Sequence, residues 1–222
     1  MGLNIVLFGS PGVGKGTYTQ ILRDIYNLPH ISTGDLFRDN IKNNTELGIK
    51  AKKYMDKGEL VPDEITTNML KERLENDDAE DGFFLDGFPR TLPQAGELDK
   101  IIKIDAVINY VADDEVIINR LSGRRICRNC GFIFHVKNVP PKKEGICDKC
   151  GGELYQRDDD KPEAIKERLE EYRKKTKPVL DFFNKKKIVH QINANKDIND
   201  PEAHIIEDTQ EVLDKLMNEE GE

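Results

Sequence analysis

A nine-residue segment near the start of the chain has the residue types that bind phosphate. The segment GSPGVGKGT, residues 9–17, follows the apolar run 5–8 and precedes a helical pattern that begins at Lys15. Its glycines let the backbone curl so that successive N–H groups point at phosphate oxygens, and Lys15 adds a positive charge. The positive end of the helix dipole favours the same anion. The pattern predicts a phosphate-binding loop, and the lysine disfavours the alternative of a glycine-rich turn without a ligand.

The segment departs from the general phosphate-loop pattern at the position that usually holds magnesium. A Ser or Thr commonly follows the lysine directly, whereas here Gly16 follows it and Thr17 comes next. We therefore expect Mg2+ to be held mainly through water and phosphate, as is common for this ion. Asp86 ends the apolar run 83–85, so a strand would place its carboxylate beside the loop, where it can orient the water ligands of Mg2+. The alternative interpretation of Asp86 is a helix cap or turn residue.

Four cysteines have the spacing of a metal site. They form two Cys-x-x-Cys pairs separated by sixteen residues, Cys127 with Cys130 and Cys147 with Cys150. A glycine follows each pair, as in two zinc knuckles, which predicts a tetrahedral Zn2+ site with four thiolate ligands. Such a site has no position left for water, so the metal would be structural. Four reduced free thiols are the main alternative, iron can occupy the same ligands, and His135 is not expected to be a ligand.

The composition limits the classes of function. The 222 residues are 37% apolar and 34% charged, with a formal net charge of −8. This composition is typical of a water-soluble globular chain, and the acidic balance disfavours non-specific nucleic-acid binding. No apolar run approaches the roughly 20 residues that span a bilayer, and the N-terminus lacks the pattern of a secretory signal. We expect a cytoplasmic protein with neither a membrane nor a nucleic acid as partner.

The elements that must position these residues alternate along the chain. Strands are predicted at 5–8, 30–32, 83–85, 106–111 and 188–192. Helical patterns occupy 15–26, 33–58, 62–75, 114–122, 163–183 and 201–217. This alternation predicts an α/β fold with a parallel sheet that helices cover on both faces. From Cys127 onward, about 30 residues rich in Gly, Pro, Lys and Cys interrupt the rhythm and predict an inserted subdomain.

Several motifs together resemble the adenylate kinase family in its long-lid, zinc-binding form. They are GSPGVGKGT at 9–17, STGDL at 32–36, DGFPR at 86–90 and GRR at 123–125, followed by Arg157 and Arg168. The resemblance covers nearly the whole chain in the right order. It implies a P-loop kinase fold with a core (1–31, 62–123 and 162–222), an AMP-binding segment (32–61) and a zinc-bearing lid (124–161). The implied reaction is ATP + AMP ⇌ 2 ADP in a monomeric enzyme of purine nucleotide interconversion and energy homeostasis.

The resemblance also assigns roles to individual residues. On the ATP side it implies contacts from Gly12, Val13, Gly14, Lys15, Gly16, Thr17, Arg120, Arg124, Ile133, Phe134 and Lys196. On the AMP side it implies contacts from Thr33, Arg38, Glu59, Leu60, Val61, Gly87, Phe88, Pro89, Arg90, Gln94, Arg157 and Arg168. The implied catalytic set is Lys15, Asp86, Arg90, Arg124, Arg157 and Arg168.

The arginines of this set suit phosphoryl transfer, which needs positioning and charge neutralisation. Guanidinium groups bind phosphate oxygens in pairs and keep their charge. We expect Asp159 and Asp160 to orient these arginines when the lid closes; a solvated acidic loop is the alternative. A closing lid would exclude water, with hinge regions at Gly123 and at 161–162.

Two positions depart from the family pattern, and three other classes of protein share some of these motifs. Tyr18 stands where Gln is usual and Ala194 where Gly is common, and both substitutions fall near the expected ATP site. A GTPase would need Asn-Lys-x-Asp, and the segment 195–198 lacks the final Asp. A zinc-ribbon nucleic-acid binder conflicts with the acidic balance. A UMP/CMP kinase resembles the core but typically has a short lid without zinc, so the long lid and Thr33 favour AMP.

Overall fold

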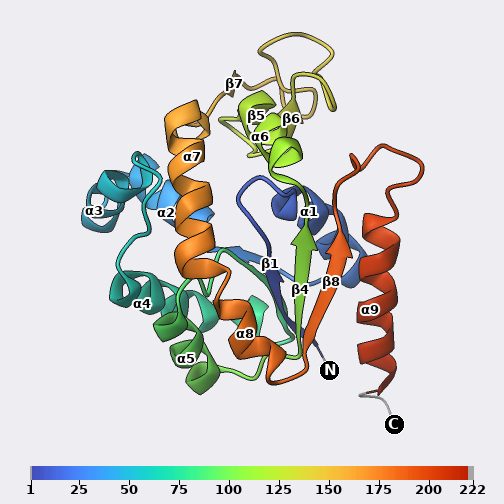
Figure 1. Ribbon diagram of the computed structural model, residues 1–222. Helices are drawn as coiled ribbons and strands as arrows, with labels where there is room; N and C mark the ends of the chain where they lie inside the picture. Colours follow the sequence, from blue (N-terminus) through green and yellow to red (C-terminus); the bar gives the residue numbers. More distant parts are fainter. Residues whose placement is uncertain (1, 220–222) are drawn as a thin grey trace.

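The computed structural model describes residues 2–219, so the ends of the predicted core at 1 and 220–222 lie outside the described residues. A five-stranded sheet lies at the centre, with the strand order β2-β3-β1-β4-β8 and parallel pairing throughout (Figure 1). Its strands are β1 (Asn4–Phe8), β2 (His30–Ser32), β3 (Phe83–Asp86), β4 (Ala106–Val111) and β8 (Val189–Asn193). The predicted parallel α/β sheet is confirmed. Each predicted strand is present within one or two residues of its expected bounds.

Helices cover both faces of this sheet, because alternate residues of each strand point to opposite sides. Ile5 and Leu7 of β1 join the apolar core beneath α1 (Lys15–Tyr26) and α9 (Ile205–Glu219). Val6 and Phe8 join the opposite core. The helices on that side are α4 (Asp63–Leu74), α5 (Leu92–Ile101) and α8 (Val179–Asn184). The central strand is thus buried on both faces and holds its C-terminal end, where the phosphate-binding loop begins, in a fixed position.

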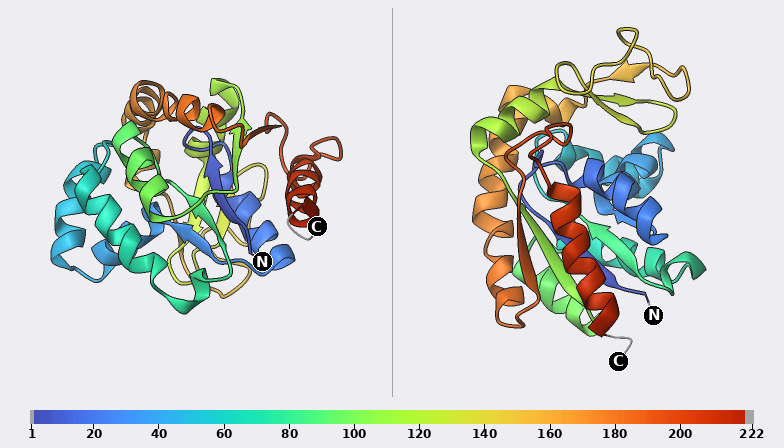
Figure 2. Two further views of the ribbon diagram at one scale, coloured as in Figure 1. Left: turned by 90° about the horizontal axis from the view of Figure 1, so that it is seen from below. Right: turned by 90° about the vertical axis from the view of Figure 1, so that its right-hand side faces the viewer.

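Two parts of the chain project from this body. The helices α2 (Thr33–Lys42) and α3 (Glu46–Met55) pack on each other and on α4 around a small core of Phe37, Ala51, Val61 and Met69. The second part has a three-stranded antiparallel sheet, in the order β6-β5-β7, formed by β5 (Arg124–Cys127), β6 (Ile133–His135) and β7 (Leu154–Tyr155). Figure 2 shows this second part standing over the end of the sheet toward which the strands run. We refer to residues 124–161 as the lid.

The lid is joined to the body by two helical segments. α6 (Asp114–Gly123) leads into it, and the short η2 (Asp158–Asp160) leads out into α7 (Pro162–Glu171). α6 and α7 pack on each other through Ile117 and Leu121 of α6 and Ile165 and Leu169 of α7. The apolar contact fixes both ends of the lid to the same structural unit.

The helices differ from the sequence prediction in five places. The helix predicted over 33–58 is two helices, and η1 (Asp77–Ala79) and α5 were not predicted. The predicted long helix over 163–183 is interrupted by a π-helical turn, η3 (Tyr172–Thr176), and by Pro178, which has no N–H to continue the ladder. The last helix begins at Ile205 and not at 201, because His204 has a φ of 41° and cannot belong to it.

Helices with the length and apolar character needed to cross a bilayer were not found among the described residues.

Candidate active site

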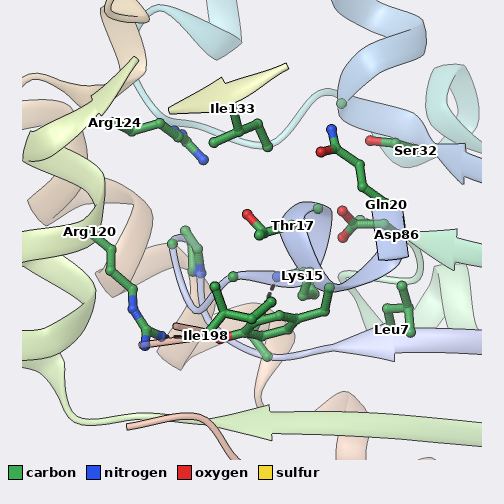
Figure 3. A pocket seen from close by; sticks show the side chains of 18 of the residues that line it. Leu7, Lys15, Thr17, Gln20, Ser32, Asp86, Arg120, Arg124, Ile133 and Ile198 are labelled. Carbon is green, nitrogen blue, oxygen red and sulfur yellow. Dashed lines mark hydrogen bonds between the residues drawn. The ribbon is translucent and has the colours of Figure 1, made fainter. Parts of the chain in front are cut away.

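The phosphate-binding loop lies where β1 ends and α1 begins, as predicted. The side chain of Lys15 turns back over the loop, and its Nζ donates hydrogen bonds to the carbonyls of Gly9 (2.8 Å) and Ser10 (3.2 Å). The first turn of α1 has no acidic residue. Lys15 and Thr17 face a cleft of about 1140 Å³. Figure 3 shows both between Arg120 and Arg124 on one side and Asp86 on the other. The loop therefore presents a cation and the positive end of a helix to the cleft.

Tyr18 supports this loop from below. Its hydroxyl donates to the carbonyl of Val13 at 3.0 Å, and its ring packs on Tyr110 with centroids 4.9 Å apart. Gly14 has a φ of 117°, and a Cβ there would lie 2.4 Å from the Tyr18 ring, so the loop conformation requires glycine. The tyrosine that departs from the family pattern is thus a buried supporting residue of the loop.

Asp86 lies at the C-terminal end of β3 beside the loop. Burial acts to raise the pKa of its carboxyl, but His30, Lys15 and Arg90 outweigh burial and hold that pKa well below its usual value. Nε2 of His30 lies 3.6 Å from Oδ2 of Asp86, a close electrostatic contact that is too long for a hydrogen bond. Asp86 is therefore an anion at the edge of the cleft. An ionised carboxylate in this position is suited to orient the water ligands of Mg2+. No feature of the sequence indicated His30.

Three arginines of the lid region are held by aspartates. Asp160, which is fully buried, accepts from Nε (2.8 Å) and Nη2 (2.5 Å) of Arg124 and from Nη1 of Arg168 (3.1 Å). Nη1 of Arg168 also lies 3.0 Å from Oδ2 of Asp159. Nη2 of Arg157 lies 3.7 Å from Oδ1 of Asp35, which places the lid against α2. The predicted aspartates thus contact the predicted arginines.

The cleft concentrates positive charge. Burial lowers the pKa of Lys15 to about 8, and the charges of Arg90, Arg168 and Arg124 act in the same direction against the opposing effect of Asp86. Burial, followed by repulsion from Arg38 and Arg124, also lowers the pKa of Arg157. These cations are destabilised as they stand, and a polyanion in the cleft would relieve the repulsion.

A smaller pocket of about 80 Å³ adjoins the cleft beside α2 and α4. Oγ1 of Thr33 and Nε of Arg90 both donate to the carbonyl of Gly87, at 3.0 and 2.8 Å. The Oε1 of Gln94 accepts from the backbone N–H of Arg90 at 2.7 Å. The residues that line the pocket include three arginines, Arg38, Arg90 and Arg168, which favour an anionic group where the pocket adjoins the cleft.

Asp63 organises this pocket, although no spacing in the sequence indicated it. Its Oδ1 accepts from Nε2 of Gln94 (2.7 Å), and its Oδ2 accepts from Oγ1 of Thr91 (2.8 Å). Thr91 is also the N-cap of α5 and accepts from the backbone N–H of Gln94. The carboxylate therefore fixes the orientation of the Gln94 amide, with its nitrogen toward Asp63.

The structure brings most of the predicted site residues together around these two spaces. Those that line the large cleft are Gly12, Gly14, Lys15, Gly16, Thr17, Arg38, Leu60, Asp86, Gly87, Phe88, Pro89, Arg90, Arg120, Arg124, Ile133, Phe134, Arg157 and Arg168. Those that line the small pocket are Thr33, Arg38, Glu59, Leu60, Val61, Gly87, Arg90, Gln94 and Arg168. Val13 and Lys196 line neither, but their carbonyls accept hydrogen bonds from Arg120 at 2.8 and 2.6 Å.

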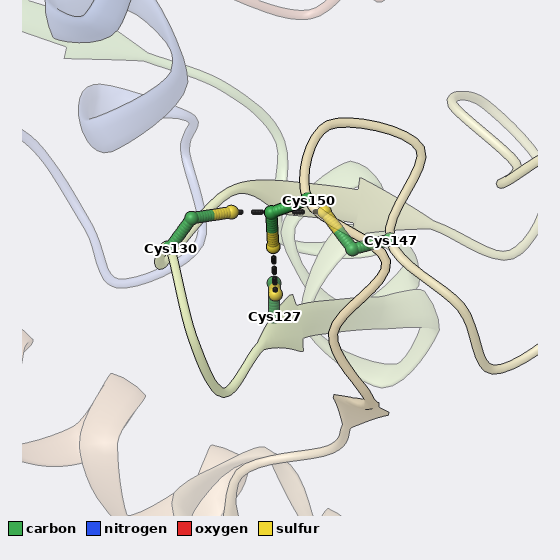
Figure 4. Close-up of side chains that lie close together, drawn as sticks. All are labelled: Cys127, Cys130, Cys147 and Cys150. Atoms are coloured by element: carbon green, nitrogen blue, oxygen red, sulfur yellow. Dashed lines mark hydrogen bonds between the residues drawn. The ribbon is translucent and has the colours of Figure 1, made fainter.

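The four cysteines converge in the lid (Figure 4). Their sulfur atoms all lie within 4.8 Å of one another, with Cys127 Sγ 3.4 Å from Cys150 Sγ and Cys130 Sγ 3.6 Å from Cys147 Sγ. A Zn–S bond of about 2.3 Å in a tetrahedron separates sulfurs by about 3.8 Å, so the cluster fits the metal. The thiols are free and do not form disulfides. Cys127 and Cys147 belong to a small apolar core with Phe134 and Leu154, and the partly buried Phe132 packs against it.

These features are those of a nucleoside monophosphate kinase: a loop with glycines and a lysine after β1, a second pocket beside the cleft, and arginines that converge on the cleft. The family model for adenylate kinase matches residues 7–188. A curated adenylate kinase of Caldicellulosiruptor bescii is 51% identical over 92% of this chain and 97% of its own length. Adenylate kinases of Archaeoglobus fulgidus (51%, 88% and 93%) and Listeria monocytogenes (54%, 89% and 94%) are similar over comparable lengths. The chain belongs to the adenylate kinase family and catalyses ATP + AMP ⇌ 2 ADP.

Proposed function

We propose that ATP binds in the large cleft with its phosphates on the loop at 9–17, and that AMP binds in the pocket beside α2. The proposal is supported above all by one observation. Lys15, Arg90, Arg124, Arg157 and Arg168 come from distant parts of the sequence, yet they line one cleft. Arginines that serve only as solvated surface residues would not be expected to gather in one cleft. The transfer of a phosphoryl group between two nucleotides, in contrast, requires many cations around one point.

The transfer itself needs no covalent intermediate on the protein. Lys15 would leave the Gly9 and Ser10 carbonyls for the β- and γ-phosphates of ATP, and Arg90 would grip the phosphate of AMP. Arg124, Arg157 and Arg168 would then neutralise the transferred group, in place of their present carboxylate partners. Asp86 would orient the water ligands of Mg2+, which supplies charge neutralisation at the phosphates when it is bound with ATP.

The lid would shield this reaction from water, and zinc would give the lid its stability. Cys127, Cys130, Cys147 and Cys150 would hold Zn2+ with no open position, so the metal would have no part in the chemistry. The lid core contains only a few apolar residues, which is too little to hold a subdomain of this length together without a further constraint. We further propose that the enzyme works as a monomer in the cytoplasm.

A coupled assay of ADP formation tests this assignment of sites. The substrate Mg-ATP is offered with AMP, GMP, CMP or UMP separately, to the wild type and to Lys15→Ala. We expect ADP formation that depends on AMP and falls at least a hundredfold in the variant, because one cation aimed at the transferred group is removed. Activity with CMP or UMP instead would move the acceptor assignment to a pyrimidine nucleotide. Hydrolysis of ATP without regard to the acceptor would contradict the two-site arrangement.

A further inference from the structure

The carboxylate of Asp197 joins two segments that are far apart in the sequence. Its Oδ1 accepts a hydrogen bond of 2.8 Å from Nδ2 of Asn138, which lies in the lid just after β6. The same oxygen lies 3.6 Å from Nη2 of Arg120 on α6. One carboxylate atom therefore contacts both the lid and the arginine beside the phosphate-binding loop.

Asn138 makes a second contact with the same part of the core. Its carbonyl accepts from Nδ2 of Asn199 at 3.3 Å. Several other contacts join the lid to α6 or to Ser122 and Gly123 at its end, such as the 3.2 Å bond from Gln156 Nε2 to the carbonyl of Ser122 and the 3.1 Å contact of His135 Nε2 with the carbonyl of Asn119. Contacts of that kind hold the lid on the helix that leads into it. Asn138 instead ties a loop of the lid to the segment 194–199, which follows β8 and contributes residues to the lining of the cleft.

Arg120 is held from the core side by three backbone carbonyls. Nη1 donates to Val13 and to Ala194 at 2.8 Å each, and Nη2 donates to Lys196 at 2.6 Å. Two of these carbonyls belong to the segment that carries Asp197. The guanidinium side chain is 12% exposed, whereas Asp197 is 46% exposed and can be reached by the lid. The position of Arg120 thus depends on the segment that the lid contacts through Asn138.

We propose that Asp197 is a positioning residue that couples closure of the lid to the placement of Arg120, and through it to binding of the donor nucleotide's base. In the closed arrangement Asn138 fixes the Asp197 carboxylate and with it the carbonyls that orient Arg120. When the lid opens, the Asn138 contact is lost and the segment 194–199 is held from the core alone. The inference rests on the proposed binding of ATP in the large cleft, and it concerns the donor side only.

The test uses the full-length zinc-loaded protein with substitutions on both sides of the contact. Asn138→Ala removes the hydrogen bond, and we expect the KM for ATP to rise about three- to tenfold. Asn138→Asp sets two carboxylates against each other and should raise it further. Combining Asn138→Asp with Asp197→Asn restores a bond with donor and acceptor exchanged, so the KM for ATP should return toward that of Asn138→Ala or lower. The KM for AMP should change less than twofold in all three.

Val136→Ala is the matched control, because Val136 lies in the same lid loop and is 47% exposed. It should leave both KM values unchanged. Hydrogen exchange at the backbone amides of 138 and 139, measured without nucleotide, reports the fraction of molecules in which the lid is closed; it should quicken in Asn138→Asp and slow again in the double variant. This exchange does not depend on catalysis, so it separates failure of the coupling from failure of the donor site. An equal rise of both KM values, or no recovery in the double variant, would overturn the proposal.

Discussion

At the scale of single residues, Lys15 shows how the site is prepared for its substrate. Its ammonium group is bound by two carbonyls of the loop that carries it, and burial lowers its pKa to about 8. Neither carbonyl neutralises the charge. Burial destabilises the charged form of Lys15, and phosphate oxygens would stabilise that form. The side chain therefore favours the nucleotide-bound state over the free state.

Replacement of Lys15 by methionine should separate charge from packing. Lys15→Met keeps most of the side-chain stem, and we expect kcat/KM for ATP to fall at least a hundredfold because a cation at the transferred phosphoryl group is lost. Stability in urea should not fall, since a destabilised buried charge is removed. Steady-state kinetics measures the expected fall in kcat/KM, and urea denaturation measures the stability. Near-normal activity would show that another group neutralises the β- and γ-phosphates.

The lowered pKa of Lys15 makes ATP binding dependent on pH with a definite sign. Above pH 8 the free enzyme increasingly holds Lys15 neutral, and the triphosphate would raise its pKa again, so binding takes up a proton. The affinity for ATP should therefore fall as the pH rises from about 8. Calorimetry at pH 9 in buffers of different ionisation enthalpy should give an uptake approaching one proton. The arginines of the cleft keep their charge at this pH, so the uptake assigned to Lys15 is the part that is missing in Lys15→Met.

Asp160 is a buried residue that we expect to contribute to the free energy of unfolding. Its carboxylate is inaccessible to solvent and joins Arg124 of β5 to Arg168 of α7. Asp160→Asn leaves the buried guanidinium of Arg124 without its charged partner and leaves Arg168 with Asp159 alone, and we expect the free energy of unfolding to fall by about 1–3 kcal/mol. Asp158→Asn in the same short helix is the control, because its pair with Lys161 is exposed and worth under about 1 kcal/mol. Equal effects in urea denaturation would contradict this.

At the scale of secondary-structure elements, the sequence predicts best where the signal is contiguous. The residues of the glycine-rich loop at 9–17 are adjacent in the sequence, and so are the two cysteines of each knuckle. The structure has the loop between β1 and α1 and the four cysteines in one cluster, as predicted. The helix α5 was missed because Pro93 and Gly96 suggest a loop, yet Pro93 lies in the first turn, where no N–H is needed. The bond between Asp63 and Gln94 joins two helices, so it has no local signal at all. The convergence of the arginines could be expected only from resemblance.

The lid is the element whose stability depends most on a metal. We expect about one Zn2+ per chain by elemental analysis. Removal of the metal with a chelator should raise hydrogen exchange across 124–160 and abolish activity, while amides of β1 and β4 stay protected, because the sheet has its own cores on both faces. Re-addition of Zn2+ should restore both readouts. A chelated lid with unchanged protection would show that the four thiols need no metal.

At the scale of the whole molecule, we expect the lid and the segment formed by α2 and α3 to move relative to the sheet when nucleotides bind. The lid contacts α2 through Arg157 and Asp35 at 3.7 Å, so the two projecting parts meet across the cleft. The helices α6 and α7 are bound to each other by apolar contacts up to the points where the lid begins and ends. Bending is therefore expected beyond this contact, at Gly123 and at 161–162, which are the hinge regions predicted from the sequence.

Closure of the lid over the cleft is the prediction that tests this arrangement. An inhibitor that joins ATP and AMP covalently would supply phosphates to all five cationic side chains at once and replace weak contacts between the lid and α2 with strong ones. We expect the radius of gyration from small-angle scattering to decrease when the inhibitor binds and the nucleotide-free enzyme to be the more open form. Arg157→Ala should reduce this change, since it removes the lid's contact with α2. A radius that is the same with and without inhibitor would show that the cleft is fully formed before the nucleotides enter.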